Sequence, residues 1–142
     1  MQNHVRRITT LAGAVVMAAA ASVQAQTSDT VTDVPFAFAI GGESMPAGTY
    51  RVSRLSHQLN VFQVSSLRQT AIVISQPEGP DDRDDSPRLL FYRYGDQYFL
   101  REIRLPGNTA YSIPQSRQER DAEERIAGRM APEVVAVRAQ HE

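Results

Sequence analysis

The stretch "RLLFYRYGDQYFLREIRL", residues 88–105, constrains the fold more than any other part of the chain. Two segments rich in alternating apolar residues flank Gly95 and Asp96. A pair of this kind is typical of a two-residue hairpin turn, because glycine adopts positive φ angles readily. Such a turn determines which residues face each other across the two strands. The predicted pairs are Tyr94–Gln97, Arg93–Tyr98, Tyr92–Phe99 and Phe91–Leu100.

Aromatic rings occupy both faces of this predicted hairpin. One face carries Leu90, Tyr92, Tyr94, Phe99 and Arg101. The other face carries Leu89, Phe91, Tyr98 and Leu100, together with Arg93 and Glu102. Because cross-strand aromatic pairs are an ordinary means of stabilising a sheet, we interpret the hairpin as the centre of the core. The alternative is a ligand-binding face, for which the candidate residues are Tyr92, Tyr94 and Arg101.

Short strands separated by turn residues are expected in the rest of the domain. The predicted strands are 34–40, 49–55, 58–66, a largely buried strand 69–75, and a short one at 110–113. Residues 76–87 are dense in Pro, Gly and Asp and predict a long exposed loop. Six to seven strands of this kind predict an all-β fold, either an antiparallel sandwich or a small barrel. The choice between these two architectures stays open.

A change of period after Pro114 predicts one helix near the C-terminus. Ser116 and Glu119 form an S-x-x-E capping box, and the pattern continues as a helix over about 116–128. Its apolar stripe is narrow, so we expect the helix to lie on the surface of the domain. The tail, 131–142, could add a last short strand or fray.

The N-terminus has the pattern of a secretory signal peptide. Arg6 and Arg7 precede an uncharged apolar run that ends in small residues. We expect residues 1–25 to be removed by cleavage between Ala25 and Gln26, leaving a flexible leader at 26–33 and a β domain at 34–130. The product would be exported, periplasmic or extracellular, with no integral membrane span after processing. The alternative is an uncleaved anchor, since the run is only slightly short of a bilayer span.

Composition argues against several classes of function. The chain has no cysteine, which excludes disulfides and thiolate metal sites, and its 15 basic residues do not outnumber its 16 acidic ones, which argues against a nucleic-acid partner. No nucleophile elbow or phosphate-binding glycine loop is present, so we expect no cofactor.

Calcium is the one metal that the sequence raises, through a cluster of loop acids. Its weak candidate ligands are Asp81, Asp82, Asp84 and Asp85. These acids stand in adjacent pairs rather than at alternate positions, so we interpret the cluster as a solubilising loop rather than a metal site.

Three stretches carry a resemblance to a family. They are "VPFAFAIGGESMPAGTYRV", "LLFYRYGDQYFLREI" and "SRQERDAEERIA". In combination they resemble a group of small, exported, uncharacterised bacterial proteins known from acidobacterial genomes, over about residues 34–128. The resemblance implies secretion and a β fold, and it implies no activity, cofactor or catalytic residue.

Taken together, these patterns favour a function without catalysis. We expect an exported β domain that acts as a binding or structural module of the cell envelope, with an envelope protein or carbohydrate as its partner. The alternative is an enzyme that uses carboxylates to act on envelope carbohydrate, which would need two acids facing each other across a concave pocket.

Overall fold

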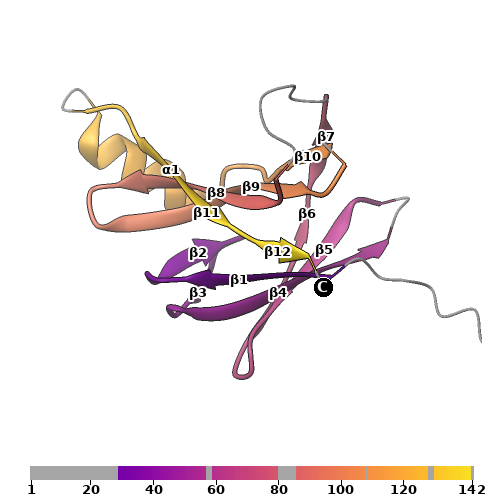
Figure 1. Cartoon of the computed structure of the whole chain (residues 1–142). Coiled ribbons are helices and arrows are strands. Elements are labelled where there is room, and N and C mark those ends of the chain that lie inside the picture. Colours follow the sequence, from indigo (N-terminus) through magenta and orange to yellow (C-terminus); the bar gives the residue numbers. More distant parts are fainter. Residues whose placement is uncertain (1–28, 57–58, 80–85, 108, 128–129, 142) are drawn as a thin grey trace, which may run out of the picture.

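The computed structural model describes residues 29–56, 59–79, 86–107, 109–127 and 130–141. These residues form two β-sheets that pack face to face, with one helix on the outside of the second sheet (Figure 1). The all-β class with a single C-terminal surface helix is therefore confirmed. The described strands are more numerous than the six or seven expected, because several short edge pieces flank the main strands.

Each sheet is built mainly from antiparallel neighbours. The first sheet has the strand order β12–β1–β4–β5–β6, with β12 Gln140–His141, β1 Thr30–Val34, β4 Gly48–Ser56, β5 Val61–Ser65 and β6 Thr70–Ile74. The second has the order β11–β8–β9–β10–β7, with β11 Glu133–Arg138, β8 Arg88–Tyr94, β9 Gln97–Leu105, β10 Thr109–Ser112 and β7 Gln76–Glu78. A small hairpin, β2 Phe38–Ile40 and β3 Glu43–Met45, attaches to β9 through a parallel contact between Ala39 and Phe99.

The two sheets are joined at both edges by strands that bend from one sheet into the other. β6 passes through Ser75 into β7, and β11 passes through Ala139 into β12. Both corner residues are buried and hydrogen-bonded: Ser75 donates its backbone N–H to the Asn60 carbonyl, and Ala139 donates to the Pro87 carbonyl. The architecture is thus a sandwich whose corners are formed by bent strands, which brings it close to a flattened barrel.

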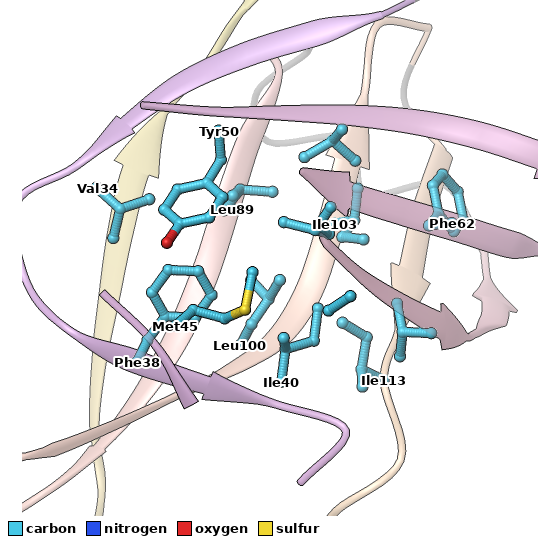
Figure 2. Close-up of a cluster of buried hydrophobic side chains, with 14 of the residues drawn as sticks. Val34, Phe38, Ile40, Met45, Tyr50, Phe62, Leu89, Leu100, Ile103 and Ile113 are labelled. Carbon is cyan, nitrogen blue, oxygen red and sulfur yellow. The ribbon is translucent and has the colours of Figure 1, made fainter. Parts of the chain in front are cut away.

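Apolar side chains from both sheets fill the space between them. Figure 2 shows side chains from β1, β2 and β4 meeting those of β8 and β9 in this core. Phe91 lies at its centre, where its ring makes edge-to-face contacts with Phe36 and Phe38 at centroid distances of 5.0 and 5.2 Å. Tyr50 is buried as well, and its hydroxyl donates a hydrogen bond to the Pro46 carbonyl.

The β8–β9 hairpin has the predicted turn and the four predicted pairs. Gly95 has a φ of 66°, which a two-residue turn of this type requires. Beyond Leu100 the register shifts, because Phe91 pairs with Leu100 while Leu90 pairs with Glu102. Arg101 is therefore the extra residue of a β-bulge.

The bulge changes which residues of β9 face the core. Leu100 and Ile103, three residues apart, are both buried in the main core. Our placement of Glu102 on the same face as Phe91 and Leu100 was therefore wrong: Glu102 lies on the outer face, paired with Arg104. The bulge also marks a change of neighbour, because β9 contacts β2 before it, at Phe99, and β10 after it.

The N-terminal part of the domain differs from expectation in two places. β1 begins at Thr30, inside the stretch expected to be a flexible leader, and its Thr30 and Thr32 side chains are buried. The Thr32 hydroxyl donates to the Arg138 carbonyl, which makes burial of this polar side chain acceptable. The expected strand 34–40 is also divided, because the chain leaves the first sheet after Val34 and joins the second at Phe38.

The segment 69–79 also differs from expectation. β6 alternates between buried and exposed residues, so the prediction that it is largely buried was wrong. The β-branched residues of β6 suggested full burial, but β6 is an edge strand with one open face. The expected loop 76–87 begins instead with β7, which pairs with β10. Residues 80–85 of that loop lie outside the described residues.

The helix lies on the second sheet, and the tail adds one strand to each sheet. Helix α1, Arg117–Ile126, begins after the N-cap Ser116, whose side chain accepts the backbone N–H of Glu119 as the capping box predicts. The tail, which the sequence left undecided, forms β11 along β8 and β12 along β1.

Candidate functional site

The helix is attached to the outer face of the β8–β9 hairpin by one small apolar contact, one polar cluster and an exposed hydrogen bond from Arg125 to the Gln97 side chain. The apolar part consists of Ala122 packed with Tyr94 and Phe99, and with Ile126 at its margin. The rings of Tyr94 and Phe99 meet edge to face at 5.7 Å. This contact is much smaller than the core between the sheets, so the polar groups beside it have a large share in positioning α1.

The polar cluster consists of Tyr94, Arg101 and Glu119. One carboxylate oxygen of Glu119 accepts a hydrogen bond from the Tyr94 hydroxyl at 3.1 Å and from Arg101 Nη1 at 2.8 Å. Glu119 is only 1% exposed. A buried carboxylate is costly unless it is paired and hydrogen-bonded, and here a guanidinium and a phenol supply that pairing.

Arg101 is held from three sides. Its Nε donates to the Ile113 carbonyl at 2.9 Å, its Nη1 donates to Glu119, and its guanidinium lies 4.9 Å from the centroid of the Tyr92 ring. The bulge at Arg101 allows this, since a bulge re-aims a side chain relative to the regular alternation of the strand. The arginine therefore connects the helix, the hairpin and the segment that leads into the helix.

The same environment changes the acidity of Tyr94. Burial, followed by the negative charge of Glu119, raises the pKa of Tyr94 to about 12. A phenol with a raised pKa stays protonated and donates its hydrogen bond throughout the neutral range. Tyr94 therefore acts in this cluster as a hydrogen-bond donor and not as a base.

The structure brings together the three residues that the sequence offered for ligand binding. Tyr92, Tyr94 and Arg101 lie on one face of the hairpin, as predicted, but α1 covers that face. Tyr94 is 4% exposed, while Tyr92 is partly buried beneath Arg101. A ligand-binding role for these residues stays a prediction, and only the margin at Tyr92 is open to it.

Sequence reasoning did not identify Glu119 as the partner of Arg101. Its position three residues after Ser116 was explained by the capping box alone. A second signal was present: the helix bears few apolar residues, so it needs polar contacts to stay on the sheet. The direction of the Glu119 side chain depends on the docking of the helix, which local sequence does not encode.

The remaining predicted sites lie outside the described residues. These are the acids Asp81, Asp82, Asp84 and Asp85 and the cleavage position between Ala25 and Gln26. Within the described ranges, no group of three or more His, Asp or Glu side chains is arranged to hold a metal ion. In the same ranges, no helix has both the length and the apolar character needed to span a bilayer.

The described surface has shallow hollows, three of which bear on the carboxylate alternative. The first, of about 180 Å³, lies between the β2–β3 hairpin and the β8–β9 turn and has Asp96 as its only acid. The second, of about 440 Å³, lies over β4 beside Leu67 and has no acid. The third, of about 320 Å³, lies at the end of α1 and has Glu133 as its only acid, paired with Arg93. None of the three offers two facing carboxylates.

The first sheet presents an uncovered apolar strip along its edge strand. Ile72 and Ile74 of β6 are 63% and 68% exposed. They lie on the outer side of the sheet, away from Ala71 and Val73, which are buried in the core. We call Thr70, Ile72 and Ile74 the β6 edge. Ile72 and Ile74 therefore give this edge a small apolar outer surface.

Comparison with known proteins adds no relative. No family model, no curated protein and no solved structure matches the chain.

Proposed function

We propose that the chain is a non-catalytic exported β domain that acts as a binding or structural module of the cell envelope. Its N-terminal sequence supports export, because a basic start, an uncharged apolar run and small residues before Gln26 form a signal-peptide pattern. The partner would be an envelope protein or carbohydrate.

One observation carries the proposal: the described side chains best suited to catalysis are used to hold the fold together. Glu119, the one buried acid among the described residues, accepts hydrogen bonds from Arg101 and Tyr94 beneath the helix. A carboxylate acting on a substrate has to reach the reacting atoms, and Glu119 is enclosed by its own chain.

The distribution of the other acids supports the same proposal. Glycoside cleavage with two carboxylates needs a pair separated by about 5 to 10 Å on either side of the scissile bond. The hollows described above contain at most one acid each, Asp96 or Glu133. No described feature favours the enzyme that acts on envelope carbohydrate.

Export is tested by expressing the full chain in a bacterium with a functional secretion pathway. We expect the protein in the periplasm or medium, with Gln26 as its first residue by N-terminal sequencing. Replacement of Ala25 by a bulky residue should block cleavage at that position. A chain that starts at Met1 and stays in the membrane fraction would contradict the proposal.

Binding and catalysis are tested with purified processed protein and isolated envelope material. We expect the protein to sediment with the envelope in a saturable manner, while an exported marker protein of the same host, used as a control for trapped volume, stays in the supernatant. The same mixtures should show no release of reducing sugar above that of buffer. Release that grows with protein concentration and disappears when one acid is replaced by its amide would establish the enzyme instead.

A further inference from the structure

β6 is the outermost strand of the first sheet. It pairs with β5 on one side, and no described strand pairs with its other side. An edge of this kind presents unpaired backbone N–H and C=O groups, which are a template for another strand. Whether another strand can pair here depends on which residues direct these backbone groups outward and on whether their side chains favour contact.

The hydrogen bonds at the two ends of β6 establish which backbone groups are free. Ser75 donates to the Asn60 carbonyl at 3.0 Å, and Ser66 donates to the Gln69 carbonyl at 2.8 Å, so residues 69 and 75 face β5. Backbone direction alternates along an antiparallel strand, so Ala71 and Val73 also face β5. Thr70, Ile72 and Ile74 therefore direct their N–H and C=O groups toward the open side.

The β6 edge lacks the features that usually prevent strand addition. Exposed edge strands commonly carry a charge, a proline or a bulge, whereas β6 reads Thr-Ala-Ile-Val-Ile and pairs with β5 in unbroken register. The residues with free backbone groups are also those with outward side chains, and two of the three are highly exposed isoleucines. An added strand would gain backbone hydrogen bonds and apolar contact at the same positions.

We infer that the β6 edge binds the β6 edge of a second copy of this chain, antiparallel, about a two-fold axis at Ile72. In this register Ile72 faces Ile72 of the other copy, and Thr70 faces Ile74. Every free N–H and C=O of the three residues then finds a partner, because all of these pairs are of the hydrogen-bonded type. A two-fold arrangement closes on itself and does not continue into a fibre.

Charges on either side of the β6–β7 segment favour this orientation. Arg68 lies two residues before β6, and Glu78 is the last residue of β7, beyond the corner at Ser75; both side chains are exposed with no ion-pair partner among the described residues. Antiparallel pairing brings the positive end of one strand to the negative end of the other. Parallel pairing would bring like charges together, which is unfavourable.

This inference goes beyond the proposed function, because it concerns a second copy of the chain and not the envelope partner. The pairing strand has five residues, so the contact is small and its strength should depend visibly on concentration. The two-fold axis requires that Ile72 of one copy face Ile72 of the other.

The test measures the mass of the processed protein by sedimentation velocity over a wide range of concentrations. We expect a monomer–dimer equilibrium for the parent chain. Ile72→Glu and Ile72→Lys should each be monomeric, because like charges would meet at the axis, and an equimolar mixture of the two should regain a dimer. Val134→Glu is the matched control, since Val134 is an exposed apolar strand residue of the other sheet, and it should dimerise as the parent does.

Several outcomes would overturn the inference. They are a parent chain that stays monomeric at all concentrations, a dimer that survives both Ile72 substitutions, a mixture that stays monomeric, or growth into open-ended assemblies. Circular dichroism of each variant shows that the fold is kept, because the replaced side chain is outside the core. A monomeric parent that still sediments with envelope would contradict this inference and leave the proposed function standing. A dimer that does not sediment with envelope would support this inference and contradict the proposed function.

Discussion

Replacement of Arg101 by methionine should destabilise the domain strongly. Methionine keeps much of the volume of the side chain but cannot donate hydrogen bonds. The change removes the 2.8 Å contact to Glu119, the 2.9 Å contact to the Ile113 carbonyl and the stacking on Tyr92. Tyr94 alone would then remain as a side-chain partner of the buried carboxylate.

The magnitude follows from the burial of the pair. The side chains of Arg101 and Glu119 are 23% and 2% exposed, so this is not a surface ion pair worth about 0 to 1 kcal/mol. Removing one partner of a buried pair costs about 3 to 5 kcal/mol, because the other charge stays buried without compensation. At about 4 °C per kcal/mol for a domain of this size, the melting temperature should fall by roughly 12 to 20 °C.

Thermal and urea unfolding of four purified variants tests this reasoning. Arg101→Met should be the least stable, while Arg101→Met combined with Glu119→Leu should recover most of the loss, since no buried charge remains. Glu119→Gln should cost less than Arg101→Met, because the arginine that it leaves can reach water. Arg93→Met is the matched control: Arg93 lies on the same hairpin, but it pairs with Glu133 on the exposed surface. The reasoning is refuted if Arg101→Met unfolds like Arg93→Met, or if the double variant is less stable than Arg101→Met alone.

Three further predictions concern the hairpin. Phe91→Ala removes a fully buried ring and should cost about 3 to 5 kcal/mol in urea unfolding, while Tyr92→Ala should cost noticeably less; equal costs would contradict the assignment of the two faces. Gly95→Val should lower the melting temperature, and Gly95→Asn should lower it much less. The φ of Gly95 is 66° and an added Cβ would have no atom within 4 Å, so the two variants differ in how well each residue adopts this backbone conformation. The pKa of Tyr94 is raised to about 12, so the folded chain keeps a proton that an unfolded tyrosine loses near pH 10. The free energy of unfolding should therefore fall between about pH 10 and 12. Tyr94→Phe should weaken this pH dependence, and part of it should remain because burial also raises the pKa of Tyr50. An unchanged pH dependence would show that Tyr94 is not its source.

The hairpin was predictable because its information is local. Gly95 specifies the turn, the turn specifies the pairs, and the alternation of Phe91 with Tyr92 separates the two faces. The N-cap at Ser116 was predictable for the same reason, since the residues that form it are three positions apart. Each of these features depends on residues that are neighbours in the sequence.

The bulge at Arg101 was not predictable from local sequence. It occurs where β9 exchanges β2 for β10 as its neighbour, and these strands come from distant parts of the chain. The backbone N–H of Ile113 donates to the Arg101 carbonyl at 2.7 Å, so the bulge itself is held by a residue beyond β10. The misplacement of Glu102 follows from this, because every residue after an unrecognised bulge is assigned to the wrong face.

The exposure of β6 was likewise not predictable from local sequence. A β-branched segment such as residues 70–74 is equally suited to a strand buried on both sides and to an edge strand whose outer face is apolar. The position of β6 at the end of the first sheet decides between them, and position is a property of topology rather than of composition. An edge that carries isoleucine where a charge would prevent association has given up protection against strand pairing. Pairing with a second copy would account for such an edge, and the Ile72→Glu and Ile72→Lys variants test this pairing at a single residue.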